Sequence, residues 1–233
     1  MAHGSRDPRA AESIEALLDL VRDSRPGLRV VTSYLDHAAP APVPALTALP
    51  SADAVVLPLL LTPAYHSKID IPGVLHAAQS RRPELALRTA GTLGPHPLML
   101  DALERRLGSP DPDTAVVLVS AGSSDPTANA IIARMAHDWQ LRGWWAVRPA
   151  YASAALPTPV EAIRTLYDLG APRVVVASYF LAPGHFADRV RTAAEEAGAA
   201  EVSPALGAVP ELAQIILDRY DAAVPSRAPV LIR

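Results

Sequence analysis

Two histidines and one aspartate stand near apolar segments that are typical of buried strands. His3 precedes a Gly-Ser turn, His66 comes after the apolar run AVVLPLLL, and Asp36 closes the apolar run LRVVTSYL. Because the carboxyl ends of parallel strands form the ligand crevice of an open α/β sheet, we expect these side chains at one edge. Two imidazoles and one carboxylate indicate a site for a borderline divalent metal such as Fe²⁺, Co²⁺ or Ni²⁺. Residue types alone leave metal binding and acid–base chemistry both open.

The other histidines stand in less informative places. His76 and His137 fall on helical stretches, where surface or packing roles are expected. His96, in LGPHPLM, precedes a helix, so a loop or capping contact is expected and it is only a weaker site candidate. His185 is the second weaker candidate, and His37 is assigned no role.

Strands and helices alternate along the chain. Apolar runs predict strands at 28–35, 54–61, 114–121, 144–151 and 173–181. Their near-continuous Val and Leu content is typical of strands that are covered on both faces. Between them, apolar residues recur at helical spacing, as in Ile14, Leu17, Leu18 and Val21, and in Met99, Leu103 and Leu107. This alternation predicts a parallel α/β fold.

Four sequence blocks occur twice, in the same order. The pairs are AHGSRDP (2–8) with SAGSSDP (120–126), SYLDHAAPAPVPAL (33–46) with AYASAALPTPVEAI (150–163), VVLPLLLTPAYH (55–66) with VVVASYFLAPGH (174–185), and LGPHPLMLDALERRL (93–107) with LGAVPELAQIILDRY (206–220). The first three blocks are displaced by roughly 117–120 residues and the last by 113. We therefore expect two α/β halves, residues 1–108 and 114–221, joined by GSPDPD and followed by a tail, 222–233.

The start of the first copy differs from the start of the second. A strand, 114–120, precedes the SAGSSDP loop, whereas only Met1 stands before AHGSRDP. We therefore expect the chain as given to lack its first strand, and in-frame codons upstream to encode an apolar one.

The copies keep their turns but differ in the candidate ligands. His3 becomes Ala121 and Asp36 becomes Ser153, whereas His66 retains a counterpart in His185. The retained turn residues are Gly4 with Gly122, Pro8 with Pro126, and Pro40 with Pro157. This pattern favours one working site in the first half, with the second half as the opposite wall of a cleft. Simple drift of the second copy would leave the same pattern.

These blocks resemble a known family. AHGSRDP, SYLDHAAP, LLLTPAYHSKIDIP and LGPHPLM are similar to the signature blocks of the class II tetrapyrrole chelatases of the sirohydrochlorin type. Those enzymes insert Fe²⁺ for siroheme or Co²⁺ for cobalamin. The resemblance covers nearly the whole chain, because the long form of that family is also duplicated. It implies an α/β fold of two chelatase-like halves, each a parallel sheet in an α/β/α sandwich, that face a central cleft.

The resemblance also implies roles for particular residues. His3 and His66 match the family's two metal-site histidines, and both are implied to bind metal and accept protons. Asp36 matches a position that is usually glutamate; it is one methylene shorter and is implied to complete the metal shell or orient a histidine. Side chains beside the histidines are implied to meet the carboxylates of the substrate, namely Ser5, Arg6, Ser67 and Lys68, with Arg9 as a weaker candidate.

The implied reaction brings M²⁺ into the macrocycle while two pyrrole protons leave. Histidine, with a pKa of about 6.5, is a suitable base for that step. We expect no organic cofactor, and ATP-driven insertion is disfavoured because the chain has no GxxxxGK[ST] motif. The metal is expected as a substrate.

Composition narrows the alternatives. The 233 residues contain no cysteine, which excludes disulfides, thiolate metal sites and a cysteine nucleophile. A net charge of −3 gives no general attraction for nucleic acid, and no run of apolar residues is long enough for a membrane span. We expect a cytoplasmic protein that is a monomer, with a dimer as the alternative.

Three other functions stay open. A non-catalytic protein that binds or delivers a metal or tetrapyrrole would use the same residues, and so would a nickel-specific chelatase. A histidine phosphoesterase is disfavoured, because that family needs an arginine where Ala2 stands.

Overall fold

A four-stranded parallel sheet lies at the centre of the second half. The computed structural model describes residues 1–63 and 70–224. The strand order is β4–β3–β5–β6. The strands are β3 (Thr114–Ser120), β4 (Ala146–Tyr151), β5 (Arg173–Ser178) and β6 (Glu201–Val202). Every residue of β3 is buried, as expected for a strand covered on both faces.

The two faces of this sheet belong to different core clusters. Val116 and Leu118 of β3 pack in one cluster with buried residues of α4 (Leu98–Leu107) and α5 (Pro126–Gln140). Val117 and Val119 point the other way, toward α6 (Pro159–Asp168) and α7 (His185–Glu196). This alternation follows from the period-2 direction of side chains in a strand.

The first half has a smaller parallel pair, β1 (Asp53–Val56) and β2 (Ala86–Thr89). Besides α4, its helices are α1 (Pro8–Ser24), α2 (Pro42–Thr47) and α3 (Ile71–Arg81). In α1 the predicted apolar stripe is buried, namely Ile14, Leu17, Leu18 and Val21. Among the described residues, no helix combines the length and apolarity that crossing a membrane requires.

The Asp-Pro pair of the first repeated block starts a helix in each half. Asp7 accepts a hydrogen bond from the Arg9 backbone N–H at 3.0 Å, and Asp125 accepts one from the Thr127 N–H at 2.9 Å. The following proline occupies the first helical position, where the absence of an N–H costs nothing. Helix capping thus explains why both copies retain this pair.

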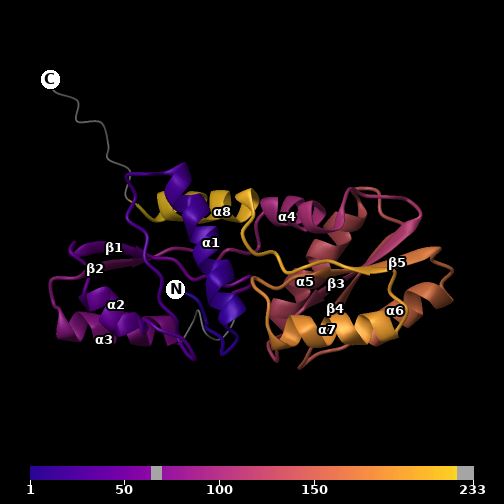
Figure 1. The fold of residues 1–233 in the computed structure, drawn as a ribbon, viewed down its shortest axis with the longest axis horizontal. Coiled ribbons are helices and arrows are strands. Elements are labelled where there is room, and N and C mark those ends of the chain that lie inside the picture. Colours follow the sequence, from indigo (N-terminus) through magenta and orange to yellow (C-terminus); the bar gives the residue numbers. More distant parts are fainter. Residues whose placement is uncertain (64–69, 225–233) are drawn as a thin grey trace, which may run out of the picture.

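The last helix of each copy packs on the other copy. Glu104 of α4 accepts a hydrogen bond from Trp139 Nε1 of α5 at 2.9 Å. Correspondingly, α8 (Pro210–Ala223) packs against α1, where Asp221 pairs with Arg25 at 2.5 Å. Figure 1 shows α8, in yellow, beside α1, and α4 on the side of the second half. The two halves therefore share one large core cluster.

Residues 1–3 take the place that the end of β3 takes in the second half. The Leu35 N–H donates to Ala2 O at 2.9 Å, as the Ala152 N–H donates to Ser120 O at 2.9 Å. A parallel bridge also joins Ala2 to Tyr34. The first half thus repeats the strand-end geometry of the second.

The strand predicted at 28–35 is wrong except for the bridge at Tyr34. A cavity of about 290 Å³ lies between residues 28–33 and 53–57. Within residues 1–63 and 70–224, no backbone hydrogen bond joins these two segments. Segment 28–33 therefore has strand-forming residues but no strand partner along most of its length in the described part of the chain.

The other strand predictions hold with shorter bounds. The run 54–61 forms a strand only at β1, because Pro58 lacks an N–H for a ladder. The runs 114–121, 144–151 and 173–181 contain β3, β4 and β5. The short strands β2 and β6 were not predicted, since neither has an apolar run of its own.

The shared core gives a stability prediction. Leu103 of α4 is 1% exposed, and we expect Leu103→Ala to lower the free energy of unfolding by ~2–5 kcal/mol, because it leaves a cavity. Leu141→Ala is the matched control, because Leu141 is 74% exposed, and its change should stay within about 0.5 kcal/mol. Urea titration followed by circular dichroism measures both. Equal effects of the two substitutions would contradict the packing of α4.

Candidate functional site

A cleft of about 870 Å³ opens where the strand-end loops of the two halves face each other. We call it the cleft. One wall comes from residues 2–7 and from Tyr34, His37 and Ala38, and the other comes from residues 180–188. Its volume is within the range of small-molecule sites. The predicted arrangement of two halves around a central cleft is thereby confirmed.

The turn at Gly4 sets the geometry of the first wall. Gly4 has φ +98°, and a Cβ there would lie 1.8 Å from the backbone oxygen of Asp36. Only glycine permits this approach. The Asp36 N–H donates to His3 O at 2.8 Å, so His3 and Asp36 are held side by side at the ends of neighbouring segments.

His3 lines the cleft and its side chain is exposed to solvent. His66, Ser67 and Lys68 lie outside the described residues. In residues 1–63 and 70–224, no three histidine, aspartate or glutamate side chains are grouped as ligands for a metal ion. The predicted cluster of His3, His66 and Asp36 therefore stays a prediction.

The carboxylate of Asp36 contacts His37. Its Oδ1 accepts the backbone N–H of His37 at 2.8 Å, and its Oδ2 lies 3.2 Å from His37 Nε2. Asp36 is not among the described residues that line the cleft, whereas His37 is. The ring centres of His3 and His37 are 6.4 Å apart, nearly edge to face. Sequence analysis gave His37 no role, although its position beside Asp36 in a strand-end turn was the available signal.

The predicted carboxylate-binding residues divide into two groups. Ser5 and Arg6 line the cleft, and the Arg6 side chain is exposed. Arg9 lies outside the lining and is held by two carboxylates, Asp7 at 2.5 Å and Asp188 of α7 at 2.6 Å. The hydrogen bond to Asp7 is the main reason that the pKa of Arg9 is raised. Arg9 thus joins the two halves beside the cleft, because Asp188 belongs to the lining of the second wall.

The two weaker histidine candidates lie in different places. His185 begins α7 and lines the cleft on the wall opposite His3. His96 accepts the Leu98 N–H on Nδ1 at 3.3 Å, beside α4, and lies outside the described lining of the cleft. Burial, followed by the charge of Arg219, lowers the pKa of His96. His96 thus makes a local contact in the loop before α4.

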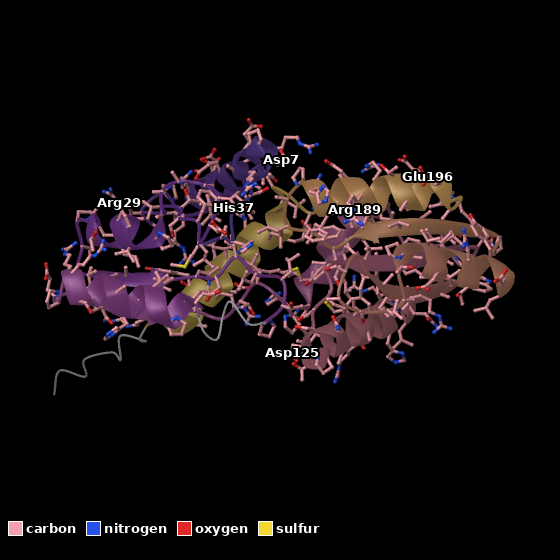
Figure 2. All side chains as sticks on the ribbon, turned by 90° about the horizontal axis from the view of Figure 1, so that it is seen from below. Asp7, Arg29, His37, Asp125, Arg189 and Glu196 are labelled. Carbon is pink, nitrogen blue, oxygen red and sulfur yellow. The ribbon has the colours of Figure 1, made fainter. Side chains whose placement is uncertain are left out.

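The second wall is more apolar than the first. Phe180, Leu181 and Phe186 line it, and Phe186 is 43% exposed although it is a large apolar side chain. Figure 2 labels His37, which belongs to the first half, and Arg189 on α7 of the second half. A flat, partly apolar ligand with polar edges would find complementary walls here.

Comparisons with known proteins agree with this geometry. The CbiX family model matches the chain twice, over residues 1–109 and 115–223. A sirohydrochlorin cobaltochelatase of Priestia megaterium is 30% identical over 195 residues, which are 79% of this chain and 63% of that protein. A sirohydrochlorin ferrochelatase of the same organism is 24% identical over 204 residues, 84% of this chain and 77% of that protein.

The fold comparison gives the same family. The solved structure of SirB from Bacillus subtilis with Fe³⁺ is similar to this chain with a TM-score of 0.82 and 25% identity, covering 95% of this chain and 92% of that one. The chain spans less than two thirds of the length of the cobaltochelatase. Since the family model matches nearly all of the sequence, in two copies, the resemblance predicted from the motifs is confirmed, and the chain belongs to the CbiX family.

Proposed function

We propose that this protein inserts a divalent metal, Fe²⁺ first and Co²⁺ as the alternative, into sirohydrochlorin with release of two protons. The observation that carries the proposal is the cleft, which places His3 opposite an apolar wall that includes an exposed phenylalanine. The curated relatives support the reaction class, because one is named a cobaltochelatase and the other a ferrochelatase. Both act, by name, on sirohydrochlorin.

The reaction requires a base and a temporary ligand. In our proposal ring nitrogens of His3 and His66 hold the incoming ion. As the ion passes to the macrocycle nitrogens, each released imidazole nitrogen accepts one pyrrole proton, which then passes to solvent. The exposure of the His3 side chain suits this role, because a proton must leave and a metal must arrive. An imidazole with a pKa of about 6.5 can gain or lose a proton near neutral pH at a small cost in free energy.

The substrate combines a flat ring with charged edges. Phe186 and Phe180 offer the apolar surface against which a macrocycle face packs. Arg6 lines the same cleft and offers a guanidinium that binds carboxylates in a bidentate manner. Ser5, Ser67 and Lys68 complete the proposed carboxylate contacts. Because both walls come from one chain, we propose that a monomer suffices.

His3→Ala and His66→Ala are each expected to reduce the metallation rate at least ~100-fold, because each removes a proposed base and ligand. The measurement is spectrophotometric: sirohydrochlorin is mixed with Fe²⁺, Co²⁺ and Ni²⁺ in parallel, and spontaneous insertion is subtracted.

His76→Ala is the matched control, since His76 is an exposed histidine on α3 outside the described lining of the cleft. It should retain the wild-type rate. Full activity of His3→Ala or of His66→Ala would refute the assigned roles. Tight binding of metal or sirohydrochlorin by the wild type, with no acceleration, would instead favour a delivery protein, and turnover with Ni²⁺ alone would favour a nickel chelatase.

The repeated turn offers a paired test of where the site lies. A Cβ on Gly4 would lie 1.8 Å from Asp36 O, and a Cβ on Gly122 would lie 1.9 Å from Ser153 O. We therefore expect Gly4→Ala and Gly122→Ala to lower the free energy of unfolding by similar amounts, more than ~1 kcal/mol each. Only Gly4→Ala should also lower the metallation rate of the folded protein by tenfold or more, because it displaces His3. A matching rate loss in Gly122→Ala would place the chemistry in both halves.

A further inference from the structure

We propose that His37 is a ligand of the incoming metal ion and that Asp36 acts through His37, as a positioning residue, instead of binding the ion itself. This inference rests on the proposed function, since it concerns the same metal. It assigns a role to a histidine that sequence analysis left without one.

The first step of the argument is which side chain faces the cleft. His37 belongs to the cleft lining together with His3, whereas Asp36, among the described residues, does not. The side chain of Asp36 is 61% exposed and that of His37 is 36% exposed. A ligand that enters the cleft therefore meets His37.

The second step is the contact between the two side chains. Asp36 Oδ2 lies 3.2 Å from His37 Nε2, while Oδ1 accepts the His37 backbone N–H at 2.8 Å. Histidines that bind metals commonly donate one ring N–H to a carboxylate, which fixes the ring and leaves the other nitrogen for the ion. With Nε2 engaged by Asp36, Nδ1 is the nitrogen that is left for a metal.

The third step is distance. A divalent ion sits ~2.1 Å from an imidazole nitrogen, so two rings on one ion have centres at most about 6.5 Å apart, and they lie closer when the ligand angle is tetrahedral. The ring centres of His3 and His37 are 6.4 Å apart at an interplanar angle of 85°. With the His37 ring held by Asp36, we expect a rotation of the His3 side chain to bring a nitrogen of each ring to one ion.

The fourth step asks whether the backbone of this turn needs the Asp36 and His37 side chains. The second half has Ser153 and Ala154 at the positions of Asp36 and His37, with φ +59° at Ala154 and +61° at His37. The backbone contacts agree as well: the Ser153 N–H donates to Ala121 O at 3.0 Å, as the Asp36 N–H donates to His3 O at 2.8 Å. The fold thus makes this turn without the Asp–His pair, so the pair is not needed for the turn itself.

The repeat also supplies variants that the scaffold accepts. The variants are Asp36→Ser, His37→Ala and the double substitution, which recreates the Ser153–Ala154 pair of the second half. The probe is Co²⁺ alone, added to the full chain, with the visible d–d absorption and the dissociation constant as readouts. Thermal melts confirm that each variant is folded, and His76→Ala is the control with wild-type binding.

We expect His37→Ala to weaken Co²⁺ binding by tenfold or more and to change the d–d spectrum, because a nitrogen ligand is lost. Asp36→Ser should weaken binding by a smaller factor and keep the wild-type band shape. The double variant should bind no more weakly than His37→Ala, because Asp36 acts only through His37. Asp36→Asn, which keeps an oxygen near Nε2, should recover part of the affinity that Asp36→Ser loses.

Wild-type affinity and spectrum in His37→Ala would overturn the inference, as would an additional loss from Asp36→Ser in the His37→Ala background. Absence of Co²⁺ binding by the wild type would overturn it as well. The proposed function is tested separately. If the wild type accelerates metallation while His37→Ala binds Co²⁺ normally, the function stands and this inference fails. If the wild type binds Co²⁺ through His37 without accelerating metallation, the inference stands and the function fails.

Discussion

The close approach of Gly4 to the carbonyl oxygen of Asp36 is the contact on which the site depends. A side chain at Gly4 would overlap that oxygen, so the turn requires glycine at φ +98°. The contact places the end of the first segment against the end of the second, and so brings His3 within 6.4 Å of His37. The same contact recurs between Gly122 and Ser153. There, Ala121 and Ala154 stand at the positions of His3 and His37. The scaffold is therefore common to both halves, and the difference between them lies in a few side chains.

The second constraint is that neither half is self-contained. The last helix of each copy packs on the other copy. A hydrogen bond joins Trp139 to Glu104 of α4, and an ion pair joins Arg25 to Asp221 of α8. Beside the cleft, Arg9 bridges Asp7 and Asp188 across the two halves. Such exposed ion pairs contribute little to stability. The core cluster that the two halves share holds the walls in position. A cleft with one histidine-bearing wall and one apolar wall needs that fixed relation.

Much of this arrangement could be predicted from the sequence, and the exceptions have physical reasons. The four repeated blocks predicted the duplicated fold, and the turn at Gly4 and Gly122 recurs in the structure because turn chemistry is local. The predicted strand 28–35 failed beyond Tyr34, because a strand needs a partner as well as β-forming residues. The position of His37 beside Asp36 in a strand-end turn is visible in the sequence, but the contact between the two side chains and the direction of the cleft depend on the fold. The sequence offers Arg9 as a weaker candidate for a substrate contact, whereas its guanidinium binds Asp188, a residue 179 positions away.

The central claim is that the metal binds at the first-half wall of the cleft. The most direct measurement is a crystal structure of the protein soaked with Co²⁺, with diffraction recorded at the cobalt absorption edge. The account predicts an anomalous peak within ~2.1–2.3 Å of a ring nitrogen of His3, with His37 as a second ligand. A peak held by His185 on the opposite wall, with none beside His3, would contradict it.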